Sequence, residues 1–114
     1  MLADKPRVIH ANLAQAALEN DNVDAHVHLY KSHGVKIDVM AVTQGVPAEV
    51  HGHETQMIHV VEGTGYVVTG DCLQNKTRVT PGSVVIIPPG ITHKIVNAGG
   101  TRNLLRFFTV YCHD

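Results

Sequence analysis

The chain has 114 residues, a length that fits one domain with one hydrophobic core. Its nine Lys and Arg residues against ten Asp and Glu leave a formal charge of −1, which gives no electrostatic reason to expect nucleic acid or an anionic membrane as a partner. A hydrophobic content of 44% and a mean hydropathy of +0.02 are typical of an ordered soluble domain. The unusual feature of the composition is the presence of nine histidines.

Residues 1–22 are predicted to form an arm that precedes the main domain. Within it, residues 7–10 favour a short strand, and the alanine-rich residues 13–19, with Asn12 as a candidate N-cap, favour a short helix. The first residues include no long apolar run, so neither a signal peptide nor a transmembrane segment is expected. With its two cysteines far apart in the sequence, the protein is expected to be cytoplasmic with reduced thiols.

Residues 23–114 are predicted to form an all-β domain. Turn residues recur about every ten residues with no long helix between them, which is typical of an antiparallel sandwich or small barrel. The predicted strands are residues 25–30, 35–42, 57–61, 66–69, 78–80, 83–87 and 103–111, with a further short strand that carries His93.

The first two of these strands carry charged or histidine side chains at alternate positions. In residues 35–42, apolar side chains alternate with Lys36 and Asp38, so we expect this strand to be half-buried with the two charged residues on its other face. In residues 25–30, His26 and His28 have the spacing that places two imidazoles on one face. The same spacing would suit a second metal site, but no third ligand is evident near them, so we expect an ordinary polar strand face.

Two other segments contain histidines in a pattern that indicates a metal site. His51 and His53 are two residues apart, and on an extended strand their side chains point to the same face. His93 follows an apolar strand and a Pro-Pro-Gly turn. If the strand that carries His93 packs beside the first segment, a third imidazole joins the other two.

These segments resemble the two sequence motifs of the cupin superfamily. The second motif matches at each of its anchor positions, which are Gly82, Pro88, Gly90, His93 and Asn97. The first motif matches at Gly45, His51, His53 and Gly63. It departs at Gln56, where cupins usually carry glutamate, although small single-domain cupins with glutamine there occur. The two motifs cover about half of the chain.

The resemblance implies a small single-domain cupin of the conserved-barrel type. Its fold would be an antiparallel double-stranded β-helix, or jelly-roll barrel, which assembles as a homodimer. Its metal ligands would be His51, His53, Gln56 and His93. Glutamine in place of glutamate removes a negative charge, which should make the metal more electrophilic while Mn²⁺ is held less firmly. Two alternatives remain open: Gln56 lies outside the ligand set, or Glu54 supplies a carboxylate instead.

The expected cofactor is a divalent transition metal, either Fe, Mn, Ni, Zn or Cu. Such a protein would act on or bind a small organic molecule, by dioxygenase-like or isomerase-like chemistry. The alternative is a non-catalytic cupin that binds or senses a small ligand, or a structural cupin with a vestigial metal site. The sequence identifies no catalytic base, because no Arg, Lys or Tyr in the motifs is certain to face inward.

Overall fold

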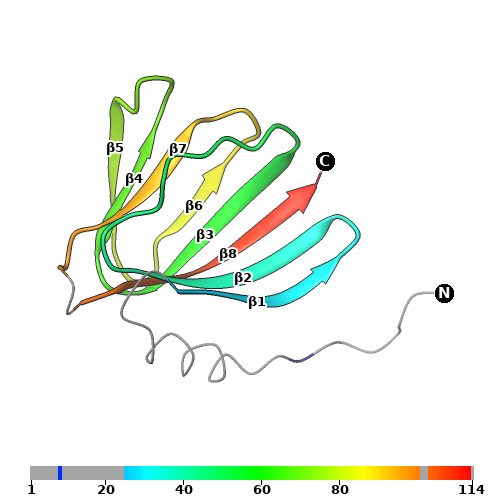
Figure 1. Cartoon of the computed structure of the whole chain (residues 1–114), viewed down its shortest axis with the longest axis horizontal. Helices are drawn as coiled ribbons and strands as arrows, with labels where there is room; N and C mark the ends of the chain where they lie inside the picture. Colours follow the sequence, from blue (N-terminus) through cyan, green and yellow to red (C-terminus); the bar gives the residue numbers. More distant parts are fainter. Residues whose placement is uncertain (1–7, 9–24, 101–102, 114) are drawn as a thin grey trace.

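In the computed structural model, the described residues are 8, 25–100 and 103–113, and they form eight antiparallel strands and no helix. The strands are β1 (Ala25–Ser32), β2 (Val35–Val42), β3 (Glu54–Glu62), β4 (Gly65–Thr69), β5 (Asn75–Val79), β6 (Val84–Ile87), β7 (His93–Asn97) and β8 (Leu105–His113). They make a five-stranded sheet, in the order β1-β2-β8-β3-β6, and a three-stranded sheet, in the order β5-β4-β7. The strands converge at one end of the molecule and splay at the other (Figure 1).

The hydrophobic core lies between the two sheets. Alternate residues of each strand face inward, and both sheets contribute to one buried cluster. That cluster consists of Met40, Val42, Ile58, Val60, Val67, Val79, Ile87, Ile95, Leu105 and Phe107. The all-β antiparallel fold expected from the sequence is therefore confirmed, and polar residues on the same inward faces are candidates for a site inside the barrel.

Strand β2 corrects one expectation. Its alternation is as predicted, but the face that carries Asp38 is the barrel interior and not the solvent face, and Asp38 is 0% exposed. The opposite face is buried as well, since Val39 and Ala41 form a second apolar cluster. The strand lies between β1 and β8, so both of its edges are paired, and residues on both of its faces are buried in apolar clusters, which a period-two pattern alone does not reveal.

Several sequence expectations lie outside the described residues. These are the short helix at 13–19 and, except for the exposed Val8, the strand at 7–10. The boundary near residue 22 stays a prediction, although the first described strand begins at Ala25. Both cysteines are described, and both are free and exposed.

Candidate metal centre

The segment before β3 is held against the start of β7. The backbone N–H of Glu49 donates to the carbonyl of His93 at 2.8 Å, and the N–H of His93 donates to the carbonyl of Glu49 at 2.9 Å. The N–H of Gly90 donates to the carbonyl of His51 at 2.8 Å. These bonds bring the two sequence motifs side by side, as the prediction for His93 required.

Three side chains converge where the segments meet. One ligand atom from each of Glu49, His51 and His93 lies within 4.8 Å of the others. Nε2 of His51 is 3.2 Å from Oε2 of Glu49, and the two imidazole rings are 5.2 Å apart, centroid to centroid. His93 is buried and His51 half-buried, whereas Glu49 reaches the surface. Two imidazoles and a carboxylate are a common ligand set for divalent transition metals.

Backbone contacts orient the buried imidazole. Nδ1 of His93 lies 2.9 Å from the carbonyl oxygen of Ile91 and donates its proton there. The lone pair is thereby placed on Nε2, the nitrogen left free to bind an ion. A metal-ligating histidine is characteristically held in this way by a hydrogen bond from its other nitrogen.

Gln56 is fixed by hydroxyl groups of β8. Its Nε2 donates to Oγ1 of Thr109 at 2.9 Å and lies 3.4 Å from the hydroxyl of Tyr111. The other end of the amide, Oε1, is buried and has no hydrogen-bond partner. Gln56 lines the same pocket as Glu49 and His93. Oε1 of Gln56 is therefore a buried oxygen of a pocket-lining residue, and it accepts no hydrogen bond.

His53 lies apart from the three-residue cluster. The chain bends at residues 52 and 53, so the pair does not lie on an extended strand, and β3 begins only at Glu54. His53 is exposed, and its ring stacks on His113 at 6.4 Å between centroids. The side chain that lies beside His51 is instead that of Glu49, two residues before it in the chain. The extended backbone that the expectation for His51 and His53 assumed is therefore absent at these residues, and the role of His53 as a metal ligand stays a prediction.

The donor atoms present fit a metal ion. Nε2 of His51 is buried and makes no hydrogen bond, although Oε2 of Glu49 lies 3.2 Å away. Together with Oε1 of Gln56, it makes two buried polar atoms without a hydrogen-bond partner, which is costly unless something binds them. The pocket has a free volume of about 20 Å³, enough for an ion or a water molecule.

Tyr111 places a phenol beside these residues, which sequence analysis did not detect. Its ring meets that of His51 edge to face at 5.3 Å. Burial raises the pKa of Tyr111 above 10.0, and the nearby carboxylates Glu49, Asp38 and Glu54 raise it further, against a lowering by the hydrogen bond with Thr109. The hydroxyl thus stays protonated at neutral pH and can donate to a bound molecule.

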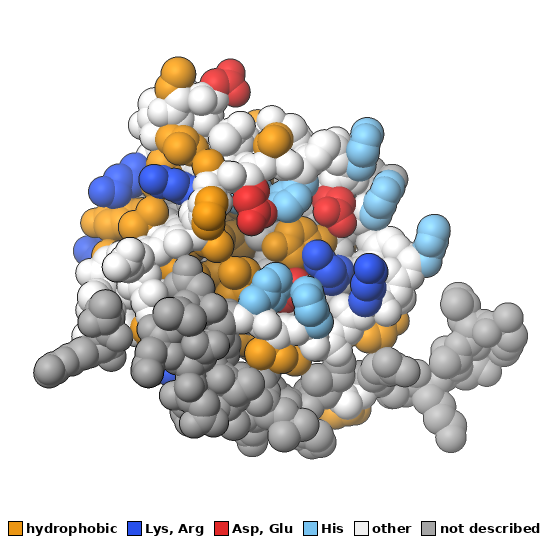
Figure 2. Space-filling view, in the orientation of Figure 1, with side chains coloured by type: hydrophobic (Ala, Val, Ile, Leu, Met, Phe, Trp, Pro, Cys, Tyr) orange, Lys and Arg blue, Asp and Glu red, His pale blue; other side chains and the backbone are white. Residues whose placement is uncertain are grey.

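Glu49 and Tyr111 were missed for different reasons. Glu49 is the second residue before His51, so the same spacing rule that selected His53 would have found it. Tyr111 lies outside both motifs on β8, and its role depends on the pairing of β8 with β3, where it is opposite Gln56. On the face shown in Figure 2, acidic and histidine side chains gather around a group of apolar side chains.

The comparisons with known proteins agree with this fold. Residues 37–111 match the family model described as the Cupin domain, and the chain belongs to this family, whose fold is the double-stranded β-helix. An uncharacterized protein of Acanthamoeba polyphaga mimivirus is 23% identical over 97% of this chain and 69% of its own length.

Two solved structures show the same fold. An uncharacterized Klebsiella pneumoniae protein with a double-stranded β-helix domain has a TM-score of 0.79 at 18% identity, covering 96% of this chain and 91% of its own. A predicted oxalate decarboxylase of Thermotoga maritima has a TM-score of 0.72 at 18% identity, covering 80% and 81%. Identities this low show the fold alone. Among the described residues, no helix has the length and apolar character needed to cross a membrane.

Proposed function

We propose that this cupin binds one divalent transition metal through His51, His93 and Glu49, with the amide oxygen of Gln56 as a further ligand. The observation that carries the proposal is the pair of buried, unpartnered atoms, Nε2 of His51 and Oε1 of Gln56, beside the imidazole of His93. The backbone carbonyl that fixes the tautomer of His93 supports it. In this ligand set Glu49 takes the place that the sequence pattern gave to His53.

The chemistry of the site follows from its charges. A bound dication would supply Lewis acidity or, for a redox-active metal, electron transfer. With one carboxylate ligand the site keeps a net positive charge, which favours a small organic anion. The phenol of Tyr111 can donate a hydrogen bond to such a molecule, and Nζ of Lys36, 4.4 Å from the centroid of the Tyr111 ring, adds a positive charge nearby.

Two functions are compatible with such a site. Oxygenation or isomerisation of a small acid would use the open metal positions. The small free volume of the pocket, about 20 Å³, favours the second candidate, in which the protein holds the metal or a very small ligand without turnover. The two functions can be distinguished by incubating the metal-loaded protein with a panel of small organic acids, including oxalate, and measuring product formation. Product formation that is lost in Tyr111→Phe supports the enzyme.

Elemental analysis tests the metal proposal directly. Tag-free protein purified without added metal or chelator should contain about one equivalent of Fe, Mn, Ni, Zn or Cu at this site. The His51→Ala/His93→Ala double variant should lose that equivalent. His59→Ala, which removes an exposed imidazole on the outer face of β3, should retain it. Equal metal content in all three proteins would contradict the proposal.

We also propose a homodimer, as expected from the family resemblance. Exposed apolar side chains on β3 and β6 support it, since Val61, Val84 and Ile86 are 50%, 56% and 58% exposed. Light scattering coupled to size exclusion gives the mass in solution, and a single 12.4 kDa species would contradict the proposal.

A further inference from the structure

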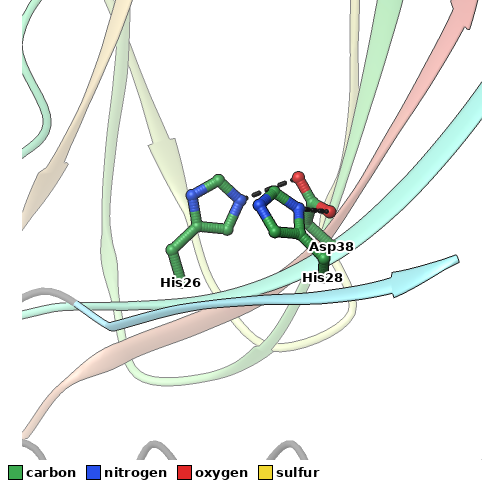
Figure 3. A group of neighbouring side chains, drawn as sticks. All are labelled: His26, His28 and Asp38. Carbon is green, nitrogen blue, oxygen red and sulfur yellow. Dashed lines mark hydrogen bonds and ion pairs between the residues drawn. The ribbon is translucent and has the colours of Figure 1, made fainter. Parts of the chain in front are cut away.

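A second group of metal-binding side chains lies on β1 and β2 (Figure 3). Nε2 of His26 is 2.7 Å from Oδ2 of Asp38, and Nδ1 of His28 is 2.7 Å from Oδ1 of the same carboxylate. The two imidazole rings are 4.7 Å apart, centroid to centroid. We name these three residues the β1–β2 cluster.

Strand register explains why these residues meet. His28 is paired with Asp38, and His26 with Met40, so all four side chains share one face of the sheet. Met40 belongs to the core between the sheets, so this face is the inner one. The sequence pattern showed His26 and His28 without a third ligand, and the structure supplies a third candidate in Asp38, which points inward beside them.

The carboxylate of Asp38 needs compensation for its burial. It is 0% exposed, and moving a carboxylate away from water costs several kcal/mol unless positive charge or hydrogen bonds offset it. Among the described residues, the ion pairs found for Asp38 are those with His26 and His28. The imidazoles themselves remain open to solvent, with side chains 41% and 67% exposed, so an ion has a path to the cluster.

We propose that the β1–β2 cluster is a second site for a divalent transition metal, separate from the centre formed by Glu49, His51 and His93. Two imidazoles and one carboxylate, whose ligand atoms all lie within 4.8 Å of one another, match the three-ligand sites of zinc and non-haem iron, which leave further positions open. In the ion-bound form, each imidazole carries its proton on the outward nitrogen and binds through the nitrogen that faces Asp38.

Little movement is needed to admit an ion. Zinc binds imidazole nitrogen and carboxylate oxygen at about 2.0–2.2 Å, which separates neighbouring ligand atoms by roughly 3 Å or slightly more. The present separations of 2.7 Å would therefore open by a few tenths of an ångström. Strand β1 is the end strand of its sheet and is paired on one side to β2, so it can shift without disturbing a second ladder.

The two sites face the same interior. Thr109 is paired with Asp38 in the register of β2 and β8, and it accepts the hydrogen bond from Gln56. One buried residue thus separates the β1–β2 cluster from the first centre. The proposal does not depend on metal at that centre, because no ligand is shared between the two groups.

Zinc titration in a background that lacks the first centre tests the proposal. Isothermal titration of tag-free His51→Ala/His93→Ala protein, stripped of metal, should show one equivalent of bound Zn²⁺. Adding His28→Gln should weaken binding more than about 100-fold, because loss of a ligand costs at least as much as loss of an orienting partner. Adding His59→Gln, at an exposed position on β3, should leave binding unchanged.

Asp38→Asn provides a second variant of the same background. It should weaken zinc binding similarly, and circular dichroism reports whether this buried substitution preserves the fold. If Asp38→Asn disrupts the fold, the test rests on His28→Gln, because the His28 side chain is largely exposed and its replacement should leave the fold intact. Nitrogen NMR of the imidazoles should show both His26 and His28 changing on zinc addition.

Two outcomes would overturn the proposal. One is no zinc uptake by the His51→Ala/His93→Ala protein, and the other is uptake that survives His28→Gln and therefore lies elsewhere, such as at His53 and His113. A wrong assignment of the first centre would give a different result. Wild-type protein and the His51→Ala/His93→Ala variant would then contain the same amount of metal.

Discussion

The side-chain amide of Gln56, which lines the same pocket as His93, donates to the hydroxyl of Thr109 at 2.9 Å and leaves its oxygen without a hydrogen-bond partner. The two residues come from β3 and β8, which are neighbours in the larger sheet. A threonine outside both motifs therefore fixes which end of the Gln56 amide is left without a partner.

Removal of that hydroxyl should loosen the amide. Thr109→Val keeps the shape of the side chain but leaves the buried amide of Gln56 short of an acceptor, so the free energy of unfolding should fall by about 1–3 kcal/mol. Metal affinity should fall roughly 10-fold or more, because the oxygen is less well oriented. Denaturant unfolding and metal titration measure the two effects. Thr77→Val, at an exposed position of β5, is the control, and equal results for both variants would show that Thr109 does not orient Gln56.

A carboxylate at position 56 should strengthen the binding of hard ions. Gln56→Glu adds a negative charge to the ligand set, so Mn²⁺ should be retained more tightly than by the parent. Competition with a fluorescent chelator gives the affinity. Gln44→Glu adds the same charge at an exposed position and should have little effect. Mn²⁺ affinity that is unchanged or weaker in Gln56→Glu would show that residue 56 does not contact the metal.

The choice between Glu49 and His53 as a ligand can be measured. Glu49→Gln should reduce metal affinity more than about 10-fold, because it removes the carboxylate 3.2 Å from Nε2 of His51. His53→Gln should change affinity much less, since its ring stacks on His113 and it is not one of the three side chains that converge in the cluster. Glu54→Gln is the matched control for Glu49, because its carboxylate is 3.9 Å from the other nitrogen of His51. The reverse order of effects would restore the ligand set predicted from the sequence.

Tyr111 should make the protein less stable in alkali. Its pKa is raised above 10.0, chiefly by burial, so above pH 10 the unfolded chain releases the phenol proton while the folded chain keeps it. This contribution to the free energy of unfolding is complete below pH 10 and is lost as pH rises through the higher folded-state value. Denaturant unfolding between neutral pH and pH 11 should show a shallower alkaline loss for Tyr111→Phe than for the parent.

A tyrosine outside the pocket controls for this measurement. Tyr66 lies under Nζ of Lys76, 4.0 Å from the ring centroid, on the face of β4 opposite the core residue Val67. Tyr66→Phe removes a hydroxyl without touching the pocket. Parallel stability curves for the parent and Tyr111→Phe would mean that the burial of Tyr111 does not penalise its ionised form.

Two glycines of the cupin motifs should differ in their tolerance of alanine. Gly63 has a φ of +86° and an added Cβ would collide with the carbonyl oxygen of Leu104, whereas Gly82 has a φ of +92° with nothing within 4 Å. Left-handed backbone costs a residue with a Cβ about 1–2 kcal/mol, so Gly82→Ala should lose about that much stability. Gly63→Ala should lose clearly more. Thermal or denaturant unfolding of both variants measures the difference, and equal losses would argue against the close approach of Leu104.

The sequence by itself determined the strands and the family. Alternating apolar residues and recurrent turns predicted the all-β antiparallel fold, and the strand at residues 35–42 was predicted with its observed bounds. The two motifs predicted His51, His53, Gln56 and His93 as neighbours, and the backbone bonds between Glu49 and His93 confirm that the motifs meet. These features are local or depend on a recurrent motif, which is why one sequence suffices to recognise them.

Only the tertiary structure decided which polar side chains share the interior. The chain bends at residues 52 and 53, where the spacing rule assumes an extended chain, and Glu49 rather than His53 joins His51 and His93 in the cluster. Asp38 was expected to face solvent, because alternation assigns two faces to a strand without saying which of them the opposite sheet covers. Tyr111 and Thr109 reach Gln56 through the pairing of β8 with β3, a contact between residues more than fifty positions apart in the chain.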